Sequence, residues 1–261
     1  METLLQMILP SALLPALLSI VVWWANKQKP ITIWALPLIW LPSYVWLIGW
    51  PSLIPAEANH WLYMVAIISV LIVLFFKSLK TVMPVMQTVL LGLALFAIAW
   101  PVLHYNFSWL LLLEMLAVTI VAYLFFNFSN KSEATSPALT MATSGGGMGL
   151  VVALGGSLLI GQLAGALASV LMAFVIVELG SKCQKPAFDL LTIVPLIQLY
   201  FLILVIARIF AELPLAPSIL LLLAPLVGLI PGKRFASAFS ISFVIAALAW
   251  LLLTADSSGY H

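Results

Sequence analysis

The feature that most constrains this chain is a succession of long apolar runs, interrupted only by short polar or proline-containing stretches. Hydrophobic residues make up 65% of its 261 residues, charged residues only 7%, and the mean hydropathy is +1.24. A soluble domain carries roughly 25% charged residues, so this composition excludes a water-soluble globule, a disordered chain and an ordinary nucleic-acid-binding protein. We therefore expect an all-α, polytopic transmembrane helical bundle.

Each apolar run can be compared with the roughly 20 residues that a helix needs to cross a bilayer. The stretch 138–180 is too long for one such helix, and the turn-competent triplet Gly155-Gly156-Ser157 divides it. The short run 218–230 is read as a span, with a tilted, interfacial or re-entrant segment as the alternative. Ten spans are then predicted, at residues 4–24, 31–49, 60–76, 81–103, 109–126, the two parts of 138–180, 187–211, 218–230 and 235–254.

The basic residues favour this count, because Lys and Arg collect in cytoplasmic loops. With ten spans, nine of the ten basic residues fall on one side of the membrane, and Arg208 is the exception. If 138–180 were a single helix, the basic residues that follow it would fall on the opposite side. The charges thus predict that both termini are extracytoplasmic. The outer side then carries acidic residues, namely Glu2, Glu57, Glu212 and Asp256.

The longest polar segment, residues 127–137, is rich in Ser, Thr and Asn and is predicted to be a cytoplasmic linker. It divides a single membrane domain into a first half, residues 1–126, and a second half, residues 138–261. Each half holds five predicted spans. Because five is an odd number, the second half would insert with inverted topology, as in many secondary transporters. The alternative is that the even division arises by chance, since the halves show no residue-level match.

Glu114 stands out because an ionisable side chain inside the bilayer costs on the order of 3 kcal/mol or more. It is the sixth residue of an otherwise apolar run, about 8 Å from the outer end at 1.5 Å per residue. Arg208 is the one basic residue predicted in the outer half of the membrane. In the functional interpretation, Glu114 contacts Arg208 or is a protonatable carboxylate beside a polar pocket. In the alternative, Glu114 is neutral or reaches outward to the membrane surface, and Arg208 pairs with Glu212 at i+4.

A second candidate feature is the glycine-rich helix that follows Gly156. Gly161, Gly165 and Ser169 recur every four residues and predict a helix-packing face that another helix can approach closely. Ser157 and Gln162 are predicted near the outer surface, at the depth of Glu114. Glycine-broken helices can expose backbone groups to substrates or ions. The candidate transport or polar site is therefore Glu114, Arg208, Ser157 and Gln162, and tight helix packing alone is the alternative for the glycine-rich helix.

No pattern in the sequence indicates an enzyme or a cofactor. It contains no P-loop, and no loop is long enough for a nucleotide-binding fold, which excludes direct coupling to ATP within this chain. The histidines lack metal-ligand spacing, and a single cysteine, Cys183, excludes an internal disulfide. We expect no catalytic residues, no metal and no cofactor.

Two motifs resemble those of known sequences. The run Gly-Ser-x-x-x-Gly-Gln-Leu-Ala-Gly-Ala-Leu-Ala at 156–168 and Ala-Glu-Leu-Pro at 211–214 are similar to patterns of an uncharacterised group of bacterial multi-pass membrane proteins. No activity is associated with that group, so the resemblance implies only a bacterial origin.

These features predict a multi-pass protein of the bacterial inner membrane that acts as a small secondary-transporter or permease-like unit. Its polar site would lie in the outer half of the bilayer. The alternative is a non-catalytic membrane subunit or scaffold that docks another membrane protein through the glycine-rich face. The expected partners are membrane lipid and either a membrane protein or a second copy of this chain, with no nucleic acid.

Overall fold

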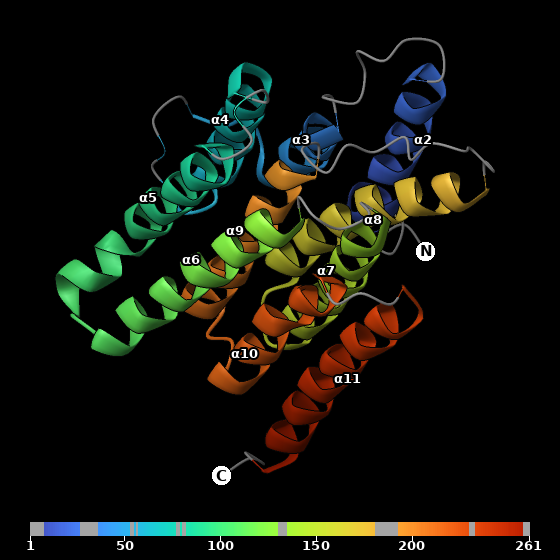
Figure 1. Ribbon diagram of the computed structural model, residues 1–261. Helices are drawn as coiled ribbons and strands as arrows, with labels where there is room; N and C mark the ends of the chain where they lie inside the picture. The colour runs from blue at the N-terminus through green and yellow to red at the C-terminus, as the bar shows by residue number, and fades with distance from the viewer. Residues whose placement is uncertain are drawn as a thin grey trace.

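The computed structural model describes residues 8–26, 36–52, 55, 57–76, 79, 82–129, 135–180, 193–229 and 233–257. Within these ranges the chain is helical throughout its regular structure and has no strand, which confirms the all-α prediction (Figure 1). Each of the ten predicted apolar runs contains a helix. In chain order the elements are η1 (Leu9–Leu13), α2 (Leu14–Asn26), α3 (Leu36–Ile48), α4 (His60–Phe76), α5 (Val82–Tyr105), α6 (Trp109–Ser129), α7 (Thr135–Leu154), α8 (Leu158–Gly180), α9 (Val194–Phe210), α10 (Leu215–Leu223), η4 (Ala224–Leu229) and α11 (Lys233–Ser257).

Three helices are long and apolar enough to cross a membrane. They are Val82–Tyr105, Trp109–Asn127 and Leu158–Ile176, with mean hydropathies of 2.1 to 2.2. The remaining apolar helices of the described ranges have 10–17 residues. This helical, apolar structure is compatible with a membrane protein.

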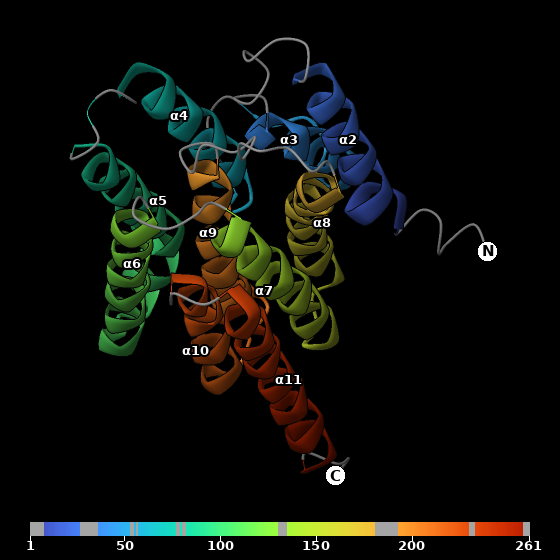
Figure 2. The same cartoon turned by 45° about the vertical axis from the view of Figure 1, so that its right-hand side comes forward.

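The core of the molecule is α9, which runs through the middle of the bundle (Figure 2). Every residue from Val194 to Ala207 is buried. A helix that is apolar on all sides is stable only when other helices or lipid cover it completely. Here α4, α5, α6, α7, α8 and α10 pack around it. The central position of α9 explains why a polar group on it has to find its partner on a neighbouring helix.

Helices α7 and α8 form the hairpin expected at Gly155-Gly156-Ser157. Gly156 has φ +121°, a backbone conformation that favours glycine, and the chain reverses there. The two helices touch through glycines: a Cβ on Gly161 would lie 2.7 Å from the Gly149 carbonyl oxygen. Small residues thus let the two backbones approach closely.

The rest of the predicted packing face, Gly165 and Ser169, contacts the turn η1 and is half-buried beside an open groove of about 500 Å³. A Cβ on Gly165 would lie 3.5 Å from the carbonyl oxygen of Ser11, which belongs to the π-helical turn η1. The Ser169 hydroxyl donates to that same carbonyl oxygen at 3.3 Å and to the Gly165 carbonyl at 2.8 Å. The face formed by Gly161, Gly165 and Ser169 is therefore a helix-packing face within this chain.

Two helix boundaries differ from the sequence prediction. The run 218–230 is not one helix: α10 ends at Leu223 and continues as the 3₁₀ segment η4, where Pro225 lacks the amide hydrogen of an α-helical bond. The segment 127–137 is not wholly a linker either, because α6 continues to Ser129 and α7 begins at Thr135.

Three of the helix ends lie at the same end of the bundle. In Figure 2, the α5–α6 turn, the α7–α8 turn and the C-terminal end of α11 all lie toward the lower edge. The sequence assigns all three to the extracytoplasmic side, and that assignment stays a prediction. Most of the basic residues used for that assignment lie outside the described residues, namely Lys27, Lys29, Lys77, Lys80, Lys131, Lys182 and Lys185.

Candidate functional site

Glu114 is positioned by the first turns of α6. The Leu111 amide donates to the hydroxyl of Ser108 at 3.4 Å, so Ser108 acts as the N-cap of this helix. The cap sets the start of α6 after a short turn from α5, and Glu114 is the sixth residue of the helix, about one and a half turns from its start. Its side chain retains 18% of its solvent exposure among apolar neighbours.

Arg208 lies in the last turn of α9, directly after the fully buried segment of that helix. A cation is favoured there, because the C-terminal end of a helix carries partial negative charge. The Arg208 side chain retains 27% of its exposure. Arg208 is the one charged residue of α9.

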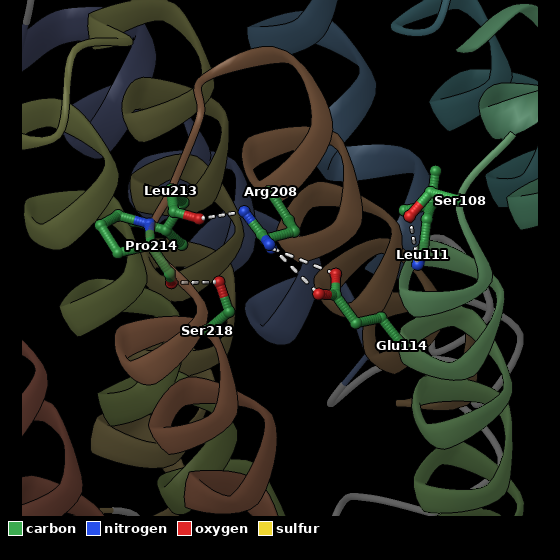
Figure 3. Close-up of polar contacts among 7 residues, drawn as sticks. All are labelled: Ser108, Leu111, Glu114, Arg208, Leu213, Pro214 and Ser218. Carbon is green, nitrogen blue, oxygen red and sulfur yellow. Dashed lines mark hydrogen bonds and ion pairs between the residues drawn. The ribbon is translucent and has the colours of Figure 1, made fainter. Parts of the chain in front are cut away.

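The structure joins these two residues in a two-pronged ion pair (Figure 3). Arg208 Nε donates to Glu114 Oε2 at 3.1 Å, and Arg208 Nη2 donates to Glu114 Oε1 at 3.1 Å. The remaining terminal nitrogen, Nη1, donates to the Leu213 carbonyl at 2.9 Å. Only a guanidinium has the planar fork that meets both carboxylate oxygens in this way. The contact joins α6 and α9 through two residues that are 94 positions apart in the chain.

Glu212, the local partner that the sequence offers, does not take this role. Helix α9 ends at Phe210, and Glu212 follows with φ +52°, outside the helix. The i, i+4 geometry that would bring it beside Arg208 requires both residues to be helical. The resulting turn instead lets the Leu213 amide bond to the Ala207 carbonyl at 3.2 Å, which presents the Leu213 carbonyl to Arg208.

A small pocket of about 50 Å³ lies between α6, α9 and α10 beside the ion pair. Glu114, Arg208 and Ser218 are its polar lining residues, and the rest of the wall is apolar. The Ser218 hydroxyl donates to the Pro214 carbonyl at 2.9 Å. The volume suffices for water or for the charged group of a small anion. The sequence analysis missed Ser218 and the Leu213 carbonyl, because only the turn between α9 and α10 brings them to Arg208.

The other two candidates, Ser157 and Gln162, do not line this pocket. Ser157 lies in the α7–α8 turn, where its hydroxyl accepts the Ile160 amide at 3.5 Å and caps α8. Gln162 lies one turn further along α8. Sequence position sets the depth of a residue along its helix but not the neighbour that it faces, and α8 meets other helices than α6. The structure therefore brings together two of the four predicted residues.

A second polar contact lies deeper in the core, among Ser69, Gln87 and Gln198 on α4, α5 and α9. All three are fully buried. Gln198 Nε2 donates to the Gln87 side-chain oxygen at 2.6 Å and to its carbonyl at 2.7 Å, while the Ser69 hydroxyl donates to Gln87 Oε1 at 2.8 Å. The two amides thus join three helices, as their apolar surroundings require.

Metal ligation has little support in the part of the chain that the structure describes. No three His, Cys, Asp or Glu residues there lie together in a group that could hold an ion. The described site is an ion pair beside a small pocket. A pair of this kind can bind a charged group and exchange a proton.

Comparisons with protein-family models, with curated proteins and with solved structures find no match.

Proposed function

We propose that this chain is a polytopic protein of the bacterial inner membrane that acts as a small secondary transporter, with the Glu114–Arg208 pair as its polar site. The observation that carries the proposal is the two-pronged ion pair between α6 and α9 beside a pocket, in surroundings that are otherwise apolar. Ionisable residues in such surroundings mark ion and substrate pathways in membrane proteins.

Exposed apolar side chains support the membrane location. Along α5, one continuous stripe of large apolar residues points away from the bundle at helical spacing, formed by Val82, Val85, Val89, Leu93, Phe96 and Trp100, each 43–64% exposed. A soluble monomer rarely exposes a contiguous apolar surface of this kind. Lipid is the solvent that suits it, and lipid is therefore the first expected partner.

Each of the ten proposed spans contains one α-helix of the described residues, and three of these helices are long and apolar enough to cross a membrane. In this topology both termini are extracytoplasmic, and the pair lies in the outer half of the bilayer. The inverted repeat has weaker support. Helix α11 packs against α7, whereas the equivalent helices of the first half, α6 and α2, lie apart in both views (Figures 1 and 2).

Proton-coupled anion binding follows from the chemistry of the pair. The ionised Glu114 carboxylate occupies the guanidinium fork of Arg208. Protonation of Glu114 removes its negative charge and leaves the charge of Arg208 uncompensated, so an anion can enter the pocket and bind Arg208. One proton and one monovalent anion are then held without net charge. Loss of the proton restores the ion pair and releases the anion.

The docking subunit has less support than the transporter. Its proposed interface was the glycine-rich face of α8, and that face packs against α7 and η1 of the same chain. A partner would have to displace α7 to reach Gly161, whereas Gly165 and Ser169 lie half-buried beside a groove of about 500 Å³. A membrane-protein partner or a second copy at another surface remains compatible with the transporter.

The test is proton uptake by purified protein in liposomes that contain the pH-sensitive dye pyranine. With an acidic exterior, the addition of chloride, nitrate or phosphate is expected to acidify the interior, faster than in protein-free liposomes, for at least one of these anions. Glu114→Gln is expected to abolish this acidification while the protein keeps its size-exclusion profile. Glu212→Gln, the matched control on the same side of the bundle, is expected to keep it.

Two results would contradict the proposal. If none of the anions drives proton uptake by the unaltered protein, the pair is not a proton-coupled anion site. If Glu114→Gln takes up protons like the unaltered protein, Glu114 is not the proton carrier.

A further inference from the structure

A second and larger cavity opens at the end of the bundle where α4 begins and α9 ends. This cleft has a volume of about 510 Å³, within the range of small-molecule sites, and α5 and α8 complete its walls. It lies against Ile206 and Phe210 of α9, whereas the Glu114 pocket lies against Val205 and Arg208. The two cavities therefore use different sides of the core helix.

Glu57 supplies the one charged group among the described residues that line the cleft. Glu57 is an exposed carboxylate that lines the cleft and has no ion-pair partner among the described residues. Asn59 also lines it, and its side-chain oxygen is buried without a partner in the described part of the chain. That oxygen has almost no exposed surface, so the exposed Glu57 carboxylate is the group that a molecule in the cleft can reach.

No basic residue lines the cleft. Arg208 is on the same end of α9 but is held by Glu114 and Leu213. His60, which follows Asn59, directs its ring to the Ser52 hydroxyl at 3.0 Å and is not a lining residue. A cleft whose lining residues carry only negative charge attracts cations.

The remaining walls suit the body of an organic cation rather than a hydrated metal ion. Trp61 and Phe210 provide aromatic rings, which attract cations through their faces. Ile98, Ile160 and Ile206 provide an apolar wall behind them. A metal ion would leave this apolar surface uncovered, whereas a molecule with both charge and hydrocarbon covers it.

We propose that this cleft binds an organic cation of the ammonium class, with its positive charge at Glu57 and its apolar body against Trp61 and the isoleucines. Such a molecule is either a free amphiphilic cation or the ammonium headgroup of a lipid. The site does not depend on transport through the Glu114 pocket, and it is tested by binding alone.

The probe is ethidium, which has a permanent positive charge, an aromatic body and two amino donors. Its fluorescence anisotropy is measured with the full-length, delipidated protein in the non-ionic detergent dodecyl maltoside. Saturable binding is expected. Glu57→Gln should raise the Kd about tenfold or more, because it removes a charge-assisted contact. Ala97→Phe, tested as a separate variant, should also weaken binding, since Ala97 lines the cleft and the larger side chain fills it.

Glu212→Gln is the matched control, because it removes a carboxylate that does not line the cleft, and its Kd should equal that of the unaltered protein. Added phosphatidylethanolamine distinguishes the two sources: competition with ethidium identifies a lipid headgroup as the occupant, and no competition identifies a free cation. The proposal is overturned if the unaltered protein shows no saturable binding. It is equally overturned if Glu57→Gln binds ethidium with unchanged Kd, whatever Ala97→Phe does.

Discussion

Removing either partner of the Glu114–Arg208 pair should destabilise the protein far more than removing both. Truncation of one member of a fully buried ion pair costs about 3–5 kcal/mol, because it leaves an uncompensated charge. Glu114 and Arg208 retain 18% and 27% exposure, so solvent or a headgroup can reach the remaining charge. We therefore expect about 2–3 kcal/mol for Glu114→Leu or Arg208→Leu.

The double variant Glu114→Leu/Arg208→Leu should recover most of this loss, since two apolar side chains suit the apolar wall of the pocket. It should not recover all of it. The Leu213 carbonyl loses the donor that Arg208 Nη1 supplies at 2.9 Å, which costs about 1 kcal/mol. The double variant should thus be about 1 kcal/mol less stable than the unaltered protein.

The assay is equilibrium unfolding in mixed micelles of dodecyl maltoside and sodium dodecyl sulfate, followed by far-ultraviolet circular dichroism. The four proteins form a double-mutant cycle that isolates the energy of the pair. The reasoning would be refuted if the single variants lost less than about 0.5 kcal/mol, or if the losses of the single variants simply added in the double variant.

Three further predictions concern helix packing and membrane topology. Gly161→Ala should lower stability by about 1–2 kcal/mol, because its Cβ would meet backbone of α7, including the Gly149 carbonyl oxygen at 2.7 Å. Gly165→Ala, whose Cβ would have its nearest atom at 3.5 Å, should be neutral or stabilising in the same unfolding assay. Equal effects of the two substitutions would contradict this reasoning. Gln198→Leu should cost about 1 kcal/mol or less, because Gln87 keeps the Ser69 hydroxyl as a donor and the change also removes Gln198 Oε1, which is buried without a partner in the described part of the chain; a loss above about 2 kcal/mol would contradict this reasoning. In the proposed topology Cys183 is cytoplasmic, so an impermeant maleimide should label it in inverted membrane vesicles and not in intact cells; the reverse pattern would exclude that topology.

Native mass spectrometry of the protein, extracted gently from its host, tests whether it binds a second membrane protein. A monomer or homo-oligomer that retains a small molecule or lipid is the expected result. A second membrane protein in fixed stoichiometry would instead favour the subunit function.

Much of the helical architecture could be predicted because it depends on local properties. Apolar runs must be helical where the backbone has no water to bond, and glycines at the α7–α8 turn permit the reversal seen at Gly156. The break in α10 was harder to predict, since Pro225 interrupts a run that is short but continuously apolar. Its final form depends on packing against α7 and α11.

The candidate site could likewise be predicted only in part. The sequence by itself determined that Glu114 and Arg208 are the isolated charges of two apolar runs, and the distance of each from its helix end. It could not determine the rotation of each helix about its axis, so it grouped Ser157 and Gln162 with them by depth. The tertiary structure decided that α6 and α9 are neighbours, that Glu212 falls outside its helix, and that Leu213 completes the coordination of Arg208. Depth along a helix follows from residue number, whereas the partner of a side chain follows from the packing of all the helices together.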